Sequence, residues 1–245
     1  MSTLSPSSSK QAVLVAGGGI GGIAAALALV RQGFDVKVIE QAPQLGEIGA
    51  GIQLGPNGFA AFDALGIGEI ARARAVYTDE MVMHDALDET CVGRIPTGAA
   101  FRQRFGNPYA VIHRADVHGS LLEGAQATGR IEVATATTVA SVEQDASGVT
   151  VIDAKGGRHR GAALIGAGGV KSAVRAQYVG DAARVSGHVV YRAVVDKKDF
   201  PADLQWNAAS IWVGPDCHLV HYPLRGGAQY NVVVTFHSRQ LEEWS

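Results

Sequence analysis

The sequence is poor in features that mark several classes of protein. It has only two cysteines among 245 residues, Cys91 and Cys217, which are too few for a disulfide framework and lack the paired spacing of a zinc site. We therefore expect a reduced, cytoplasmic protein with no bound metal and two buried thiols. The chain also lacks a basic excess, since its formal net charge is −2. This balance argues against nucleic acid and anionic membrane surfaces as partners.

Long apolar runs and hydrolytic motifs are scarce as well. Residues 12–30 carry no charge and match a membrane span in length, but the glycines of GGGIGG interrupt them. A strand, a glycine turn and a helix buried in an α/β core would have the same hydropathy as a membrane span, and we expect this arrangement for residues 12–30. The first ten residues are polar, lack the layout of a signal peptide and predict a disordered tail. No Ser-His-Asp order, HExxH motif or P-loop is visible, which disfavours hydrolytic and metal-dependent chemistry.

The residues that are present predict an α/β protein. Residues 11–16 form a short apolar run typical of a strand buried in a parallel sheet, and an alanine-rich helix over 20–32 leads to a second strand over 35–40. We expect a Rossmann-like domain with a parallel sheet and inserted β elements over residues 11–182. Short strands after residue 183 predict part of an antiparallel substrate-binding sheet over 183–245. Residues 41–58 are expected to form a long glycine-rich loop without a strand, and residues 131–135 to open an antiparallel meander.

A dinucleotide-binding pattern lies between the first strand and the first helix. Gly17, Gly19 and Gly22 form G-x-G-x-x-G, and Glu40 ends the next strand about 20 residues on. Gly17 permits a tight turn, Gly19 lets the backbone approach a pyrophosphate, and Gly22 allows close packing of helix on strand. Glu40 is expected to accept hydrogen bonds from an adenosine ribose. An acid there disfavours a 2′-phosphate, so the pattern predicts FAD or NAD rather than NADP.

Several segments together resemble one enzyme family. GGGIGG, Glu40, GEIGAGIQLGPN, VIHRADVH and LIGAGGVKSAVR are similar to the FAD-dependent aromatic hydroxylases of the single-component flavoprotein monooxygenase family, from about Gln11 to the last residue. The resemblance implies bound FAD, with NADH and O2 as co-substrates and a small phenolic aromatic acid as the molecule hydroxylated. A homodimer is one assembly that it allows. Further cofactor-binding residues implied are Arg114 at the FAD, Gly51 and Ile52 near the flavin, Val139 near the adenine, and Gly169.

The chain departs from the family at one motif. In GAGGVKSAVR, related chains carry an aspartate followed by a glycine where this sequence has Gly168 and Gly169. The aspartate would stand at position 168. An inactive flavin-binding protein therefore stays open as an alternative to an active hydroxylase. The resemblance also implies that family members continue past Ser245. We therefore expect a missing C-terminal portion, uncovered apolar faces at residues such as Val232, Val234 and Phe236, and an open sheet edge. A plain NAD-dependent dehydrogenase is disfavoured by the long loop after Glu40.

The candidate catalytic residues lie on one predicted strand. Deprotonating a phenol makes its ring a stronger nucleophile, so a group that titrates near neutral pH is wanted beside the hydroxyl. In CHLVHYPL, alternation places His218 and Tyr222 on one face and His221 on the other. The resemblance marks the pair His218 and Tyr222 as substrate-binding. Tyr191 and Arg192 are open between two roles: binding a substrate carboxylate or lying on the sheet surface.

Overall fold

The computed structural model describes residues 11–46 and 49–238, and the chain divides into two compact units. Unit 1 comprises Met1–Gly46 and Leu121–Ala182, and unit 2 comprises Glu47–Ser120 and Ala183–Ser245. The predicted domains, 11–182 and 183–245, share the boundary after residue 182 with this division. They differ over residues 47–120, which lie in unit 2 because their strands pair with strands from the C-terminal part of the chain.

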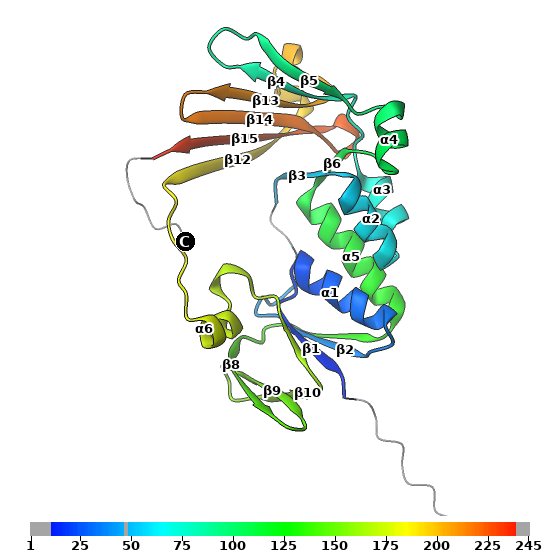
Figure 1. Cartoon of the computed structure of the whole chain (residues 1–245), viewed down its shortest axis with the longest axis vertical. Coiled ribbons are helices and arrows are strands. Elements are labelled where there is room, and N and C mark those ends of the chain that lie inside the picture. Colours follow the sequence, from blue (N-terminus) through cyan, green and yellow to red (C-terminus); the bar gives the residue numbers. More distant parts are fainter. Residues whose placement is uncertain (1–10, 47–48, 239–245) are drawn as a thin grey trace, which may run out of the picture. The chain divides into compact units, whose positions relative to one another are not determined.

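Unit 1 contains a four-stranded parallel sheet in the order β11-β1-β2-β7. Its two central strands, β1 and β2, are labelled in Figure 1. Its strands are β1 (Val13–Ala16), β2 (Val36–Ile39), β7 (Ile131–Ala134) and β11 (Leu164–Gly166). Strand β1 is buried along its whole length, and α1 (Ile20–Arg31) connects it to its parallel neighbour β2. The predicted strand-helix-strand unit is confirmed. The short helices η1 (Gly169–Lys171) and α6 (Ala173–Val179) follow β11.

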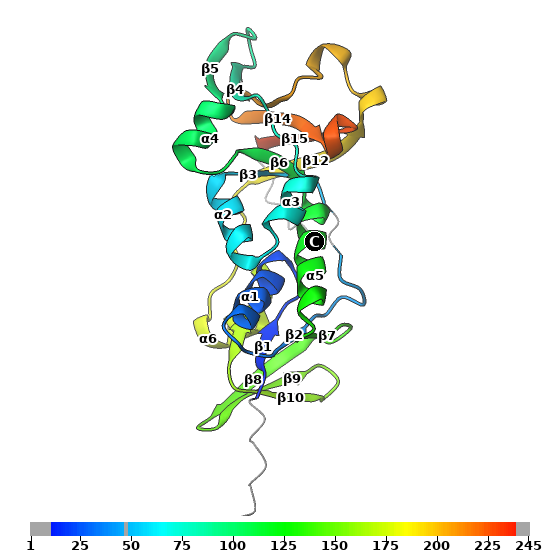
Figure 2. The same ribbon diagram turned by 90° about the vertical axis from the view of Figure 1, so that its right-hand side faces the viewer.

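A smaller antiparallel sheet completes unit 1. It has the order β10-β9-β8 and consists of β8 (Val139–Asp145), β9 (Gly148–Asp153) and β10 (Arg158–Gly161), which lie next to β1 (Figure 2). One face packs Val142 and Val151 against Leu14 of the parallel sheet. The predicted meander is confirmed for these three strands. It was wrong for residues 131–135, because β7 pairs in parallel with β2 and so extends the β-α-β winding.

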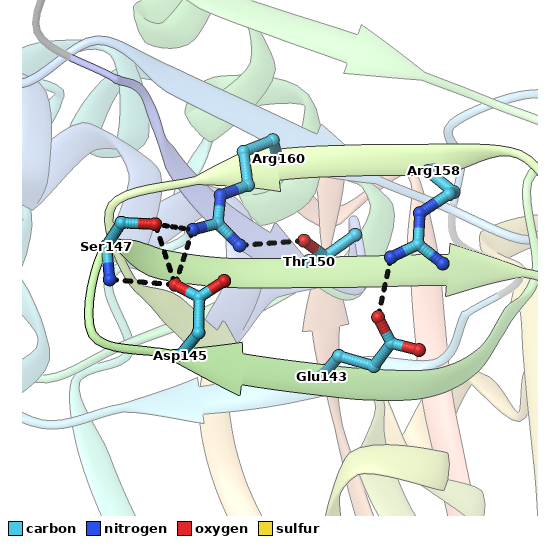
Figure 3. Close-up of polar contacts among 6 residues, drawn as sticks. All are labelled: Glu143, Asp145, Ser147, Thr150, Arg158 and Arg160. Carbon is cyan, nitrogen blue, oxygen red and sulfur yellow. Dashed lines mark hydrogen bonds and ion pairs between the residues drawn. The ribbon is translucent and has the colours of Figure 1, made fainter.

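The other face of the small sheet carries charged cross-strand pairs (Figure 3). Arg160 donates to Asp145 Oδ1 at 2.6 Å and to Thr150 Oγ1 at 3.0 Å. Arg158 Nη2 lies 2.6 Å from Glu143 Oε2. The bond from Arg160 is the main reason why the pKa of the Asp145 carboxyl lies below its ordinary value. Since these pairs are exposed to solvent, they brace neighbouring strands but contribute little to stability.

Unit 2 is built on a six-stranded sheet in the order β12-β15-β14-β13-β4-β5 (Figure 1). Its strands are β4 (Glu80–Asp85), β5 (Cys91–Pro96), β12 (His188–Asp196), β13 (Ala208–Gly214), β14 (Cys217–Leu224) and β15 (Gln229–His237). The antiparallel prediction is confirmed for β12 to β15, but β13 pairs in parallel with β4. The helices of unit 2 are α2 (Pro56–Leu65), α3 (Gly68–Arg74), α4 (Ala99–Phe105), η2 (Lys197–Asp199), η3 (Ala202–Leu204) and η4 (Arg225–Gly227). Helix α5 (Arg114–Thr128) begins in unit 2 and ends in unit 1.

The segment predicted as a continuous loop contains a strand. Strand β3 (Gly51–Leu54) pairs with β6 (Ala110–His113) in an antiparallel two-stranded sheet. The loop prediction for residues 41–58 was therefore wrong over these four residues. Their pairing partner lies some 60 residues away in sequence, so local composition does not reveal it. Residues 47–48 of the same segment lie outside the described residues.

Two smaller expectations can be compared with the structure. Strand β15, which carries Val232, Val234 and Phe236, lies between β12 and β14, and the strands at the two edges of this sheet are β12 and β5. Cys91 and Cys217 are both exposed, so the prediction of buried thiols was wrong, because each cysteine lies at the first residue of its strand.

Among the described residues, no helix is long and apolar enough to cross a membrane. Within the same residues, no three His, Cys, Asp or Glu side chains gather as metal ligands.

Candidate functional site

The glycines of unit 1 bring the start of α1 close to the end of β1. Gly17 has a φ of 116°, which side chains disfavour, and an added Cβ there would lie 2.4 Å from the carbonyl oxygen of Ala167. A Cβ on Gly22 would lie 1.8 Å from the carbonyl oxygen of Gly17. Gly19 caps α1 without a side-chain hydrogen bond, and Gly21 has open space around it. The first turn of α1 therefore presents bare backbone N–H groups, as an anion requires.

Glu40 is tied to the same turn. Its Oε2 accepts a hydrogen bond from the Gly18 N–H at 2.6 Å, and its Oε1 accepts one from the Ala42 N–H at 2.7 Å. A carboxylate has about four acceptor positions, so capacity remains for ribose hydroxyls. Glu40 thus shapes the turn in addition to the predicted role with ribose. Val139 packs partly against the core that contains Leu14, and its contact with adenine stays a prediction.

In unit 2, strand β14 separates the candidate catalytic residues by face. Tyr222 is 3% exposed and packs with Tyr109 and Leu224, whereas His221 contacts the rings of Phe200 and Trp206. The predicted alternation is confirmed. His218 is half-buried on the Tyr222 face, four residues away and so about 13 Å along the strand. That spacing leaves room for one aromatic ring between the two side chains.

An apolar cavity of about 350 Å³ opens on this face of the sheet. Val220, which lies between His218 and Tyr222, forms part of its lining with Met81 and Ile211. Gln53 also lines the cavity and is a hydrogen-bonding side chain among these apolar ones. The volume falls in the range of small-molecule sites, which are mostly apolar with a few placed polar groups.

Tyr109, which sequence reasoning missed, bonds a residue of the cavity and packs with Tyr222. The hydroxyl of Tyr109 donates to Gln53 Oε1 at 2.6 Å. Burial, and secondarily the nearby Tyr222, raise the pKa of Tyr109, while burial raises the pKa of Tyr222 to about 12. Both phenols are therefore neutral donors at neutral pH. No local pattern marks Tyr109, because its partners come from strands β3 and β14.

The remaining predicted residues of unit 2 occupy distinct places. Ile52 is half-buried in β3, and Gly51 packs so closely on the ring of Tyr222 that an added Cβ would lie 2.4 Å from Cε2. Arg114 is exposed at the start of α5 and donates its backbone N–H to the Ala50 carbonyl. Arg192 lies on the face of Tyr222 and weakly lowers the pKa of its phenol, whereas Tyr191 stacks on Phe236 on the other face. The structure thus favours Arg192 over Tyr191 as a partner for a carboxylate.

The family of the chain follows from comparison with known proteins. Residues 10–244 match the family described as FAD binding domain. The chain belongs to this family. Two curated relatives are both called 3-hydroxybenzoate 6-hydroxylase. The relative from Polaromonas naphthalenivorans (strain CJ2) is 79% identical over 232 residues, covering 95% of this chain and 58% of the relative. The relative from Klebsiella oxytoca is 58% identical, covering 94% of this chain and 58% of the relative.

Solved structures agree with this family assignment. A crystal structure of a variant of Klebsiella pneumoniae HpxO complexed with FAD has a TM-score of 0.82 and 25% sequence identity. The match covers 95% of this chain and 59% of that chain. A structure of 2-methyl-3-hydroxypyridine-5-carboxylic acid oxygenase, with a TM-score of 0.78 and 21% identity, shares the fold. The chain spans somewhat under two thirds of the length of the relatives that it matches.

The turn in unit 1 fits the FAD of this family. A bulky pyrophosphate requires a backbone approach that side chains would block, and the bare start of α1 supplies it. The second motif of unit 1 is less complete. Gly169 has a φ of 68°, and Gly168 precedes it with an ordinary φ of −75°. The resemblance leads us to expect an aspartate at Gly168, and the φ at this position is one that L-residues adopt.

Restoring the aspartate is expected to strengthen cofactor binding. We expect Gly168→Asp to tighten FAD binding roughly tenfold, since a hydrogen bond from a charged group contributes about 1.5 to 3 kcal/mol. A Cβ at Gly168 would lie 3.2 Å from the Cβ and Oγ of Ser172, which requires only a small shift. Flavin fluorescence titration of the full-length protein measures the change. Gly169→Asp is the matched control and should weaken binding, because its positive φ disfavours a side chain. No gain from Gly168→Asp would contradict the proposed contact.

The burial of His221 is expected to make the stability of the folded protein depend on pH. It is 1% exposed, and neither ring nitrogen has a hydrogen-bond partner among the described residues. Burial, with a smaller effect from His84, lowers the pKa of His221 from 6.5 to about 4. The unfolded chain therefore binds a proton more readily. The contribution of His221 to the free energy of unfolding is therefore fully present above pH 6.5. It is lost as the pH falls towards 4, and the loss is about 3 kcal/mol at most.

Urea unfolding of the full-length protein across this pH range measures the effect. We expect His221→Leu to remove this part of the pH dependence, whereas His237→Leu, at an exposed position on β15, should keep it. Identical pH profiles for wild type and His221→Leu would show that His221 does not titrate as its burial implies.

Proposed function

We propose that this chain is the FAD-binding part, with part of the substrate-binding sheet, of a flavin-dependent monooxygenase that converts 3-hydroxybenzoate to gentisate (2,5-dihydroxybenzoate) with NADH and O2. The 79% identity to a 3-hydroxybenzoate 6-hydroxylase over 95% of the chain carries this proposal. The placement of His218 and Tyr222 on one face of β14 supports it. An apolar cavity whose size suits an aromatic ring opens on the same face, and Val220, between the two residues, lines it, while His218 and Tyr222 are not among its lining residues.

The residues of unit 1 hold the nucleotide end of the cofactor. The first turn of α1 binds the pyrophosphate, Glu40 accepts from the adenosine ribose, and Val139 and Gly169 lie against adenine and flavin-side hydroxyls respectively. The resemblance assigns Gly51, Ile52 and Arg114 to the flavin. FAD held by these residues would supply the redox chemistry, with NADH as the hydride donor and O2 as the oxidant.

The sheet of unit 2 positions and deprotonates the substrate. His218 takes the proton from the phenol, and Tyr222, neutral because of its raised pKa, donates a hydrogen bond to the substrate. The resulting negative charge raises electron density para to the oxygen. In 3-hydroxybenzoate that position is carbon 6, which accounts for gentisate as the product. Arg192 supplies a cation for the carboxylate.

The test is substrate-stimulated NADH oxidation by the full-length protein, with and without added FAD, followed by chromatography of the products. We expect 3-hydroxybenzoate to accelerate NADH oxidation and to yield gentisate. Acceleration by salicylate with a different product would favour a salicylate hydroxylase-like enzyme. A flavin-loaded protein that no aromatic acid stimulates would favour the alternative suggested by Gly168, an inactive FAD-binding protein.

A further inference from the structure

Asn231 of β15 is a buried polar residue with no place in the proposed chemistry. Its side chain is fully buried, and its Oδ1 accepts a hydrogen bond from the Gly51 N–H at 2.7 Å. The two residues are 180 positions apart in sequence. Without this acceptor, the buried N–H of Gly51 would lose its partner, which is costly for a backbone group.

Gly51 is held against the residue that faces Asn231 across the sheet. In the ladder of β14 and β15, Asn231 lies directly opposite Tyr222. An added Cβ on Gly51 would lie 2.4 Å from Cε2 and 2.8 Å from the hydroxyl of Tyr222, so backbone and phenol touch. One side chain therefore sets the position of Gly51 relative to the strand that carries Tyr222.

The amide nitrogen of Asn231 shows that stability of the fold alone does not explain why an asparagine occupies this position. Its Nδ2 is buried and has no acceptor among the described residues. An unpaired buried donor is unfavourable, and the three following residues of β15 are valines, which suit a buried strand. An apolar residue at position 231 would avoid this penalty but would give up the bond to Gly51.

We propose that Asn231 is a positioning residue for oxygen transfer. It holds the Gly51 backbone, which the proposed function assigns to the flavin, at a fixed spacing from Tyr222, which the proposed function assigns to the phenol. This inference rests on the proposed function for the roles of Gly51 and Tyr222. Oxygen transfer depends on the spacing of the reacting atoms to about an ångström. Reduction of the flavin by NADH makes and breaks no bond of the phenol, so a bound substrate can stimulate that step without the same fixed spacing. Loss of the bond therefore uncouples NADH oxidation from hydroxylation.

The test compares Asn231→Leu, which removes the acceptor at similar volume, with Asn231→Asp, which keeps it. In the full-length, FAD-loaded protein, we expect Asn231→Leu to lower the yield of hydroxylated product per NADH about tenfold, with an unchanged rate of flavin reduction. Asn231→Asp should restore most of the yield. Val232→Ala, on the other face of the same strand, controls for general disturbance of β15 and should leave the yield unchanged.

Hydrogen exchange of the Gly51 amide separates this inference from the proposed function. We expect the amide to be protected in wild type and in Asn231→Asp, and to exchange rapidly in Asn231→Leu. Unchanged protection in Asn231→Leu overturns the inference, whatever the substrate proves to be. Rapid exchange with an unchanged product yield also overturns it. If Asn231→Leu does not fold, Asn231→Ser, whose hydroxyl is too short to reach Gly51, is judged by the same two measurements. A wild type that makes no product from 3-hydroxybenzoate counts against the proposed function, while the exchange data still decide the contact.

Discussion

Gly22→Ala in the full-length protein is expected to abolish the retention of FAD. The new Cβ would lie 1.8 Å from the carbonyl oxygen of Gly17, which is backbone and cannot rotate away. Gly17 itself has no freedom to retreat, because its N–H donates to the Ile39 carbonyl at 2.9 Å. Helix α1 must therefore move off the turn and withdraw its N–H groups from the pyrophosphate. Losing two such charge-assisted bonds weakens binding roughly a hundredfold or more.

Gly21→Ala is the matched control, one residue earlier in the same turn. No atom lies within 4 Å of a Cβ at Gly21, and alanine favours a helix by about 1 kcal/mol over glycine. We expect this variant to bind FAD like wild type and to melt at the same temperature or higher. Flavin content after purification, fluorescence titration and thermal melting measure both variants. If Gly22→Ala retained stoichiometric FAD, the close packing of α1 on the turn would not be needed for binding.

His218→Ala is expected to slow hydroxylation about a hundredfold while changing flavin reduction much less. The reason is that His218 removes the phenolic proton, and a positioned general base contributes roughly 10²- to 10⁴-fold. The apolar cavity on this face would be unchanged, because His218 is not among its lining residues. Rapid-mixing measurements of flavin reduction and of product formation separate the two steps.

The control for His218 is an exposed histidine rather than its neighbour on the strand. His221→Ala would open a cavity among Phe200, Trp206 and Trp212 and so reduce stability for reasons unrelated to catalysis. His237→Ala, at an exposed position, removes an imidazole without such a cavity. Product yield per NADH and turnover that stay unchanged in His218→Ala, over roughly pH 6 to 9, would exclude His218 as the base.

Local spacing in the chain was enough to predict the nucleotide end of the site. Gly17 and Gly22 belong to one strand-turn-helix segment, and β2 returns beside β1 after a single helix. Their mutual geometry is therefore dictated by chain connectivity over fewer than 30 residues. The faces of β14 were predictable for the same kind of reason, since a strand has a period of two.

The two units and the environment of the candidate catalytic residues could not be predicted in this way. Strand β4 joins β13 from a point some 130 residues earlier in the sequence, which brings residues 47–120 into unit 2. The contacts of Tyr222 with Gly51 and Tyr109 likewise come from segments more than 100 residues away.

The sequence by itself determined the α/β class, the position of the nucleotide-binding turn and the strand that carries His218 and Tyr222, because these depend on residue type and short-range periodicity. Only the tertiary structure decided that Asn231 holds Gly51, that Tyr109 bonds Gln53, and that an apolar cavity lies beside them. Such contacts are made by single side chains between segments with no common pattern. Their partners are selected by the pairing of distant strands, which no local property of the chain specifies.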